Sequence, residues 1–204
     1  MTSSSSSSSR KIILLDVDDV ILMDAYSLEL QEPPVNSRPV TGYINPNGGV
    51  QKAWVDETVL ATLRALPPEV EIFWVSSWLA MDYDQIDRLA MSLGLQRVSI
   101  ADLDGVEPGR WGMAGDFSDL GHWKTQMMRN IVRDNPDIPI LWVDDHLSFG
   151  FVRQLHYLPL SILAPVRGRG LTPESAKRIA RWCDDGQPFM QLGDDTERSL
   201  PLPH

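Results

Sequence analysis

A short apolar run that ends in three carboxylates constrains this chain more than any other feature. Ile12 to Leu15 is a continuous aliphatic block, typical of a strand buried on both faces in the middle of a parallel sheet. The block stops at Asp16, Asp18 and Asp19. Ligands of open α/β sheets bind at the carboxyl ends of strands, so we expect a ligand site at this point of the chain.

The spacing of the first two carboxylates suggests what that ligand is. Asp16 and Asp18 are two residues apart, so both can reach one site. Like charges held this close repel each other unless a cation or a proton intervenes. A divalent metal is the simplest answer, and an oxygen-rich site favours magnesium. The alternative is a polar strand exit whose acids are solvated.

Predicted strands and helices alternate along the rest of the chain. Further buried strands are expected at 70–75, 98–101, 138–143 and 160–163, and helices at 56–66, 83–93, 122–132 and 173–183. This alternation predicts an α/β fold, a Rossmann-like three-layer αβα sandwich with a central parallel sheet of about five strands.

The length of 204 residues fits one domain. We place this domain at 11–186, between a disordered Ser-rich leader at 1–10 and a flexible tail at 187–204. Asn-Gly between two β-like runs predicts a flap hairpin at 41–55 that overhangs the acidic strand end. A Gly- and Asp-rich loop is expected at 102–121. The segment after the first strand is too short for a large helical cap, so we expect a small cap or none.

Charge and cysteine content limit the possible partners. The formal net charge of −10 and the pI near 4.7 argue against a broad basic face for nucleic acid or membrane. The single cysteine, Cys183, excludes an internal disulfide and a Cys-based zinc cluster, and we expect it to be a packing residue. No segment resembles a signal peptide or a transmembrane helix, so we expect a soluble, cytoplasmic protein.

Two more predicted strands also end in polar pairs. Ser76-Ser77 follows the strand at 70–75, and Asp144-Asp145 follows the strand at 138–143. Lys124 lies in the first turn of the helix that precedes the latter strand. We expect the neighbouring His146 to cap or pack rather than to act chemically.

The order of these features resembles the haloacid dehalogenase-like (HAD) superfamily. Its four motifs correspond here to LLDVDDV, FWVSS, HWK and LWVDD, in that order, and the resemblance spans about residues 11–184. The chain is still more similar to the HAD domain of "Swiss army knife" RNA-repair proteins, through Ser76-Ser77-Trp78 and a Gly-Leu-Thr turn at 170–172. Asp19 stands where the superfamily commonly has glycine.

The resemblance implies a role for each acidic residue. Asp16 would be the nucleophile that forms an aspartyl-phosphate, and Asp18 the general acid and base. Magnesium would be held by Asp16, the backbone carbonyl of Asp18 and Asp144, with Asp145 ligating through water or orienting the others.

The remaining roles concern the phosphate. Ser76 would donate a hydrogen bond to a phosphoryl oxygen, with Ser77 as the alternative, and Lys124 would neutralise developing charge. Arg110 competes with Lys124 for that role. Substrate-binding contacts are expected from four residues: Asp19, Ser77, Arg110 and Arg169.

These features together predict a magnesium-dependent phosphohydrolase. The substrate would be a phosphomonoester: a nucleotide, another phosphorylated small molecule, or a terminal phosphate of a nucleic acid. The acidic composition opposes strong nonspecific binding of nucleic acid, which needs many Lys and Arg contacts. The alternative function is a catalytically silent HAD-like domain that acts as a binding module. The oligomeric state does not follow from the sequence.

Overall fold

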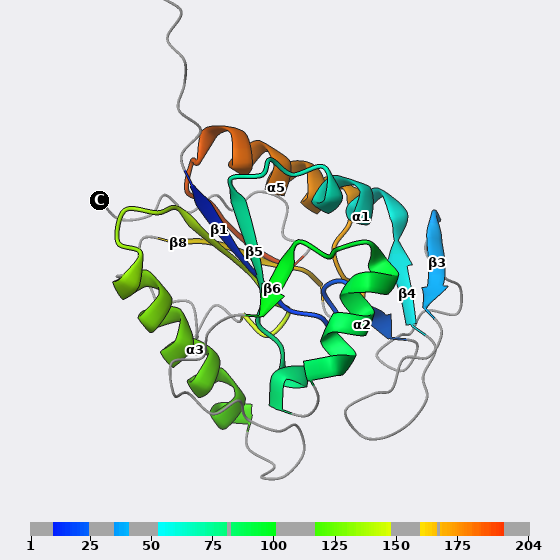
Figure 1. The fold of residues 1–204 in the computed structure, drawn as a ribbon, viewed down its shortest axis with the longest axis horizontal. Coiled ribbons are helices and arrows are strands. Elements are labelled where there is room, and N and C mark those ends of the chain that lie inside the picture. The colour runs from blue at the N-terminus through cyan, green and yellow to red at the C-terminus, as the bar shows by residue number, and fades with distance from the viewer. Residues whose placement is uncertain are drawn as a thin grey trace, which may run out of the picture.

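A computed structural model describes residues 10–24, 35–40, 53–80, 83–100, 117–147, 160–166 and 168–193. A six-stranded parallel sheet lies at its centre (Figure 1). In spatial order its strands are β6 (Val98–Ile100), β5 (Val70–Trp74), β1 (Lys11–Leu15), β7 (Ile140–Val143), β8 (Leu160–Ala164) and β9 (Met190–Leu192). The predicted α/β fold with a central parallel sheet is therefore confirmed.

The apolar run that opens the domain forms the interior strand β1. Leu15 lies opposite Trp74 of β5 on one side and Val143 of β7 on the other. All five residues of β1 are buried. The chain passes from β1 to β5 on one side of the sheet and later to β7 on the other side. The gap between β1 and β7 is therefore the topological switch point, where open α/β sheets bind their ligands.

The sheet has one strand more than predicted. β9 pairs parallel with β8, and the backbone N–H of Ile162 donates to the carbonyl of Phe189 (2.9 Å). This strand lies within the range 187–204, which we had expected to be a flexible tail. Its three residues follow a polar, Pro-containing stretch and carry no strand pattern of their own, so pairing with β8 is what makes them a strand.

Helices cover both faces of the sheet: α1 (Glu57–Arg64), α2 (Tyr83–Leu93) and α5 (Pro173–Asp185) on one face, and α3 (Phe117–Asp134) on the other. Side chains of β1 alternate between the two cores, with Ile13 and Leu15 in the first and Ile12 and Leu14 in the second. In Figure 1, α1 and α5 lie side by side along the top and α3 lies on the opposite side of the sheet. Cys183 is a buried packing residue of the first core, as expected.

Local side-chain chemistry fixes the ends of two helices. The side chain of Asp56 caps α1 by accepting from the backbone N–H groups of Thr58 (2.7 Å) and Val59 (3.1 Å). Thr172 caps α5, Pro173 occupies its first turn, and Gly186 ends it in the left-handed conformation. Both helices therefore begin where the sequence predicts.

The helix α3 corrects one prediction. It begins at Phe117, so the end of the predicted loop at 102–121 is helical. Gly121 suggested a loop, but a single glycine inside a helix costs only about 1 kcal/mol relative to alanine, which packing of α3 on the sheet can offset. The rest of that loop, at 101–116, lies outside the described residues.

A second, antiparallel sheet follows β1 in the chain. Its order is β2 (Met23–Asp24), β4 (Ala53–Asp56) and β3 (Ser37–Val40). The predicted flap at 41–55 overlaps this sheet only in β4, because β3 lies before the predicted range, and residues 41–52 lie outside the described residues. Pro39 is accommodated because β3 is an edge strand.

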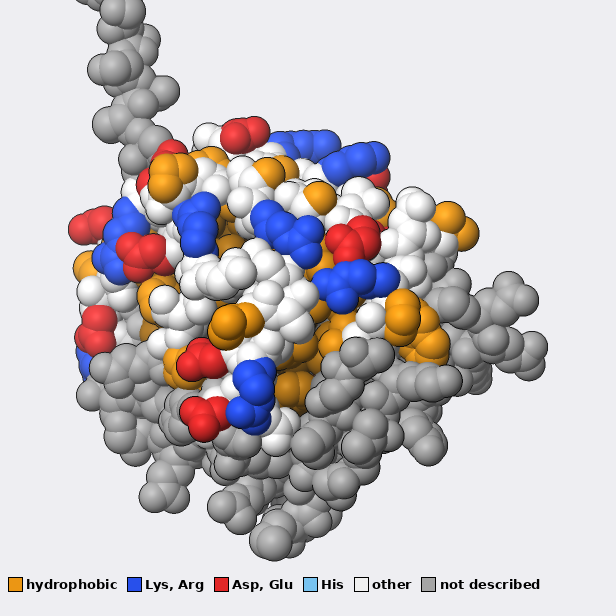
Figure 2. Space-filling model, turned by 45° about the vertical axis from the view of Figure 1, so that its right-hand side comes forward, with side chains coloured by type: hydrophobic (Ala, Val, Ile, Leu, Met, Phe, Trp, Pro, Cys, Tyr) orange, Lys and Arg blue, Asp and Glu red, His pale blue; other side chains and the backbone are white. Residues whose placement is uncertain are grey.

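The described surface mixes charges of both signs. Figure 2 shows Lys and Arg side chains interspersed with Asp and Glu over the upper part of the molecule, where α1 and α5 lie. Of the helices within the described ranges, none has both the length and the hydropathy that a bilayer span requires.

Candidate functional site

The carboxyl ends of β1 and β7 bring two aspartates together. Backbone hydrogen bonds continue past both strand ends, from Asp16 N–H to the Val143 carbonyl (3.0 Å) and from Asp144 N–H to the Leu163 carbonyl (3.2 Å). Asp16 and Asp144 are 4% and 1% exposed. Residues 128 positions apart in the chain are thereby held rigidly at the switch point of the sheet.

Lys124 joins the two aspartates. Its ammonium nitrogen lies 2.6 Å from Asp16 Oδ2 and 2.6 Å from Asp144 Oδ2. Lys124 is also buried, and it comes from α3, on the face of the sheet that packs against Trp123 and Met127. The three residues, which we call the charged trio, form one connected group of buried charges.

Burial and neighbouring charge set the protonation of the charged trio. Burial raises the pKa of Asp16 to about 7. The charge of Lys124 lowers this pKa, whereas the charges of Asp144 and Asp145 raise it further. Burial alone would lower the pKa of Lys124, but Asp144 and Asp16 raise it above its ordinary value. Lys124 therefore remains a cation, and Asp16 titrates close to neutral pH in the absence of further positive charge.

Four residues at this edge can hold a metal ion. Asp16, Asp144, Asp145 and His146 each offer one ligand atom, and these atoms all lie within 4.8 Å of one another. Three of the four offer carboxylate oxygen, which suits magnesium. Lys124 supplies only one positive charge against three carboxylates, so a divalent cation would balance the group. The donor set therefore fits a hard divalent cation.

His146 belongs to this group, contrary to our expectation that it only caps or packs. Its Nδ1 lies 2.8 Å from Asp145 Oδ1 and 3.8 Å from Asp144 Oδ1, and its backbone N–H donates to Asp144 Oδ1 (2.9 Å). Burial lowers the pKa of His146, but the hydrogen bond and charge of Asp145 raise it, and the net direction is upward. Its position next to the acidic pair was the signal in the sequence.

Asp18 points to a different partner. Its Oδ2 accepts a hydrogen bond of 2.7 Å from the indole Nε1–H of Trp78, and its side chain is not part of the four-residue group. The metal contact that the resemblance implies for the backbone carbonyl of Asp18 stays a prediction. The bond to Trp78 was not foreseen.

Asp19 occupies a position that suits glycine. Its φ of 51° lies in the left-handed region, and its backbone N–H donates to the Leu22 carbonyl (2.8 Å) in a tight turn. Glycine adopts this region without a steric penalty, whereas an aspartate adopts it less readily. Asp19 is nevertheless 8% exposed, so the chain holds a buried carboxylate in an unfavourable backbone conformation.

Ser76 and Ser77 lie at the end of β5, next to β1. The backbone N–H of Val75 donates to the Leu15 carbonyl (2.9 Å), which keeps the two strand ends in register. Ser76 is fully buried and Ser77 is 5% exposed. Ser76 Oγ accepts from the backbone N–H of Trp78 at 3.5 Å, so its own hydroxyl hydrogen remains available to a ligand.

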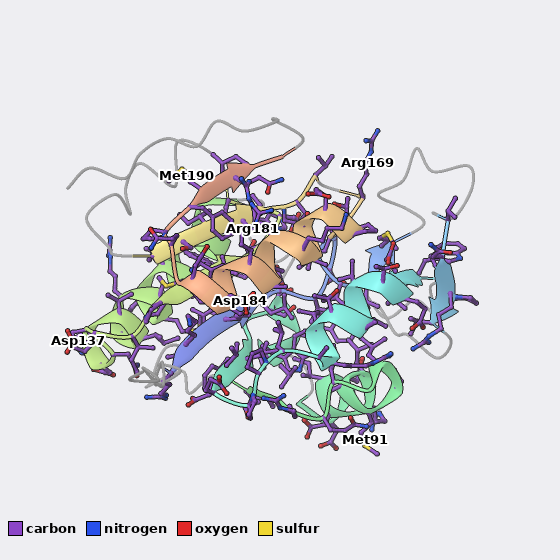
Figure 3. All side chains as sticks on the ribbon, turned by 90° about the horizontal axis from the view of Figure 1, so that it is seen from above. Met91, Asp137, Arg169, Arg181, Asp184 and Met190 are labelled. Atoms are coloured by element: carbon purple, nitrogen blue, oxygen red, sulfur yellow. The ribbon has the colours of Figure 1, made fainter. Side chains whose placement is uncertain are left out.

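The loop before α5 reaches the same turn. The backbone N–H of Leu171 donates to the Val20 carbonyl (2.8 Å), and a Cβ on Gly170 would come within 2.9 Å of that carbonyl oxygen. Arg169 is exposed and projects away from the fold beyond the start of α5 in Figure 3. Arg110 lies outside the described residues, so its predicted contact stays a prediction.

Comparisons with known proteins found a likeness in structure. No family model matches the chain, and no curated protein sequence matches it. The chain is similar to the crystal structure of 3-deoxy-D-manno-octulosonate 8-phosphate phosphatase from Moraxella catarrhalis in complex with magnesium ion, phosphate ion and KDO. The match has 11% sequence identity and a TM-score of 0.40, and it covers 87% of this chain and 91% of that one.

Proposed function

We propose that this protein is a magnesium-dependent hydrolase of phosphomonoesters. The observation that carries the proposal is the charged trio, in which a buried lysine bridges two buried aspartates at the switch point of the sheet. A buried carboxylate next to a fixed cation is a suitable nucleophile for an anionic phosphoryl group, because the cation offsets the repulsion between them. The resemblance of the four motifs to the HAD superfamily supports the same chemistry.

Asp16 begins the proposed reaction. One of its carboxylate oxygens attacks phosphorus, and the bond between phosphorus and the leaving oxygen breaks as the new P–O bond forms. Asp18 gives its proton to the leaving oxygen, so the product departs as an alcohol. Lys124 and the hydroxyl of Ser76 hold the phosphoryl oxygens, where negative charge develops.

Water completes the proposed cycle. Asp18, now ionised, takes a proton from a water molecule whose oxygen attacks phosphorus. The bond between phosphorus and the Asp16 oxygen breaks, which releases inorganic phosphate and restores both aspartates.

Asp16, Asp144 and Asp145 would hold the magnesium ion, together with the backbone carbonyl of Asp18, and His146 is close enough to orient Asp145. When bound, the ion supplies positive charge that neutralises the phosphoryl group and the nucleophile. Asp16 must be ionised to attack, and its raised pKa means that this needs positive charge nearby.

The charge of the protein limits which phosphomonoesters it would accept. The net charge of −10 and the mixed surface charges favour a phosphorylated small molecule, a nucleotide included, over a long nucleic acid. A terminal phosphate of RNA remains the substrate that the resemblance to RNA-repair proteins suggests, and Asp19, Ser77, Arg110 and Arg169 are the proposed substrate contacts. We place the reaction in the cytoplasm.

Phosphate release tests the proposal directly. The substrates are p-nitrophenyl phosphate, 2-glycerophosphate, nucleoside monophosphates, and oligonucleotides with 3′- or 5′-phosphate. Release should require magnesium, stop on addition of EDTA, and disappear in Asp16→Asn. Asp185→Asn, a change of the same kind at the exposed end of α5, is the matched control and should retain full activity.

Two outcomes would contradict the proposal. Equal release by the wild type and Asp16→Asn would exclude the aspartyl-phosphate mechanism. No release from any substrate, in protein shown to be folded, would favour the alternative of a catalytically silent domain that binds its ligand.

A further inference from the structure

The hydrogen bond between Trp78 and Asp18 links two strand ends that are 60 residues apart in the chain. Leu15 and Trp74 are partners in the register of β1 and β5. Asp18 follows three residues after the first of these, and Trp78 four residues after the second. The indole N–H therefore meets the carboxylate across the same edge that carries the charged trio.

Both partners have a fixed backbone. Trp78 lies in the short 3-10 helix η1 (Ser77–Ala80), which is closed by a hydrogen bond from Leu79 N–H to the Ser76 carbonyl (3.0 Å). On the other side, Asp18 forms a bridge with the fully buried Leu22. The backbone leaves the rotation of the Asp18 side chain open, and the hydrogen bond from the indole favours one orientation of its carboxylate.

The indole is well suited to this task. Trp78 is 3% exposed and belongs to the first hydrophobic core, so packing holds its ring in place. Its Nε1–H can donate but cannot accept a hydrogen bond or take up a proton. It can therefore orient a carboxylate that exchanges protons without competing for the proton itself.

We propose that Trp78 is a positioning residue, which holds Asp18 in the orientation needed to protonate the leaving oxygen and so extends the substrates to phosphomonoesters of ordinary alcohols. The inference rests on the proposed function. An alkoxide is a poor leaving group, so cleavage of its ester depends on a well-placed acid, whereas p-nitrophenolate leaves without one. An Asp18 that is not held in place would suffice for p-nitrophenyl phosphate. An Asp18 held by Trp78 also allows cleavage of alcohol phosphomonoesters.

A leaving-group comparison tests this inference. In Trp78→Phe, kcat for the best alcohol phosphomonoester of the panel, such as 2-glycerophosphate, should fall by about tenfold or more, a part of the full contribution of an acid catalyst. With p-nitrophenyl phosphate, kcat should fall by less than about threefold. A purely structural role for Trp78 would lower both values by the same factor.

Trp182→Phe is the matched control. Trp182 is buried in the same core and is 2% exposed, but it lies far from Asp18, in the last turn of α5. That turn ends at Gly186, and a Cβ added to Gly186 would lie 3.5 Å from Lys11, at the opposite end of β1. This variant should leave the ratio of the two kcat values unchanged. If Trp78→Phe does not fold, benzothienylalanine at position 78 replaces the indole N–H by sulfur and keeps the shape of the ring.

The possible results separate this inference from the proposed function. Equal losses on both substrates in the position 78 variant, or no loss on either, would overturn the role of Trp78 while leaving the phosphatase intact. Phosphate release that Asp16→Asn does not reduce would overturn the proposed function instead, and this inference with it.

Discussion

Two ion pairs of nearly equal length lie at opposite ends of β1, and their surroundings differ. At the amino end, Arg10 Nε is 2.5 Å from Glu71 Oε1, and the two side chains are 49% and 39% exposed. At the carboxyl end, Lys124 Nζ is 2.6 Å from Asp16 Oδ2, and these side chains are 8% and 6% exposed. The two pairs have similar distances but differ in how far their side chains are exposed to solvent.

The difference in exposure singles out the carboxyl end of the sheet as the candidate site. An exposed pair contributes about 1 kcal/mol or less, because water screens it. A buried pair loses the hydration of both charges, and apolar residues of the same size often stabilise a fold as well or better. A chain selected only for stability has no need of the charged trio, so its burial at the switch point is an argument for function.

Removal of the cation at each end should have the largest contrasting effect. Lys124→Met leaves Asp16 and Asp144 buried without their shared cation, and we expect a loss of about 3–5 kcal/mol in the free energy of unfolding. Arg10→Met, the matched control at the other end, should lose about 1 kcal/mol or less. Urea unfolding in EDTA measures both, and similar losses would mean that the two ends do not differ as described.

Magnesium should stabilise the folded protein through the carboxylates at the carboxyl end of β1 and β7, and not through Glu71 at the amino end. At about one hundred times its dissociation constant, an ion that binds only the folded protein adds about 2.7 kcal/mol. We expect a corresponding rise in the thermal midpoint of the wild type and a much smaller one in Asp144→Asn. Glu71→Gln should respond like the wild type; an equal response of all three proteins would place the ion elsewhere.

The two carboxyl groups should respond to pH in opposite directions. The folded-state pKa of Asp16 is raised from 3.8 to about 7, so its contribution to stability is present at pH below about 4 and is lost as pH rises to about 7. The pKa of Glu71 is lowered by its hydrogen bond with Arg10, so its contribution is present above its ordinary pKa of 4.5 and is lost as pH falls.

Thermal midpoints in EDTA from about pH 2 to pH 8 check these signs, because the Glu71 contribution is lost only below pH 4.5. Asp16→Asn should remove a component that decreases with rising pH, and Glu71→Gln one that increases. A wild type and an Asp16→Asn variant with parallel profiles would contradict the raised pKa of Asp16.

The smallest effect concerns the backbone next to the charged trio. Asp19 and Asn36 are the non-glycine residues with positive φ in the described chain, at 51° and 68°. Asp19→Gly should raise the free energy of unfolding by about 1 kcal/mol, and the exposed Asn36→Gly by less, since asparagine tolerates this region better. If Asp19 contacts the substrate, the same variant should raise KM; a gain in stability with unchanged kinetics would remove it from the site.

Most of the central sheet could be predicted from the sequence because its strands are strongly apolar. Leu14, Leu141 and Ile162 lie in such runs, and each run alone indicates a buried strand. β9 and β3 could not be predicted, since they contain polar or proline residues and owe their conformation to a paired neighbour. The start of α3 was missed for a related reason, because packing outweighs a single glycine.

The residues of the candidate site also fall into those that the sequence could identify and those that it could not. Asp16 and Asp144 could be selected because each follows a predicted strand, and parallel strands bring such positions to one edge. Lys124 could be selected only through the resemblance of its motif to the HAD superfamily, because it lies inside a helix. The bond between Trp78 and Asp18 could not be selected, because it depends on how far each chain turns after its strand ends. His146 was visible beside the acidic pair, but only the folded geometry brings its ring within reach of Asp145.

The interior position of β1 also has a consequence for synthesis on the ribosome. Both neighbours of β1, the strands β5 and β7, are translated after it, and Lys124 follows Asp16 by 108 residues. Contacts between such distant residues form late, since a long loop must close first. The edge of β1 that faces β7 therefore stays unpaired until β7 has been translated, and we expect the nascent chain to need a chaperone most during that interval.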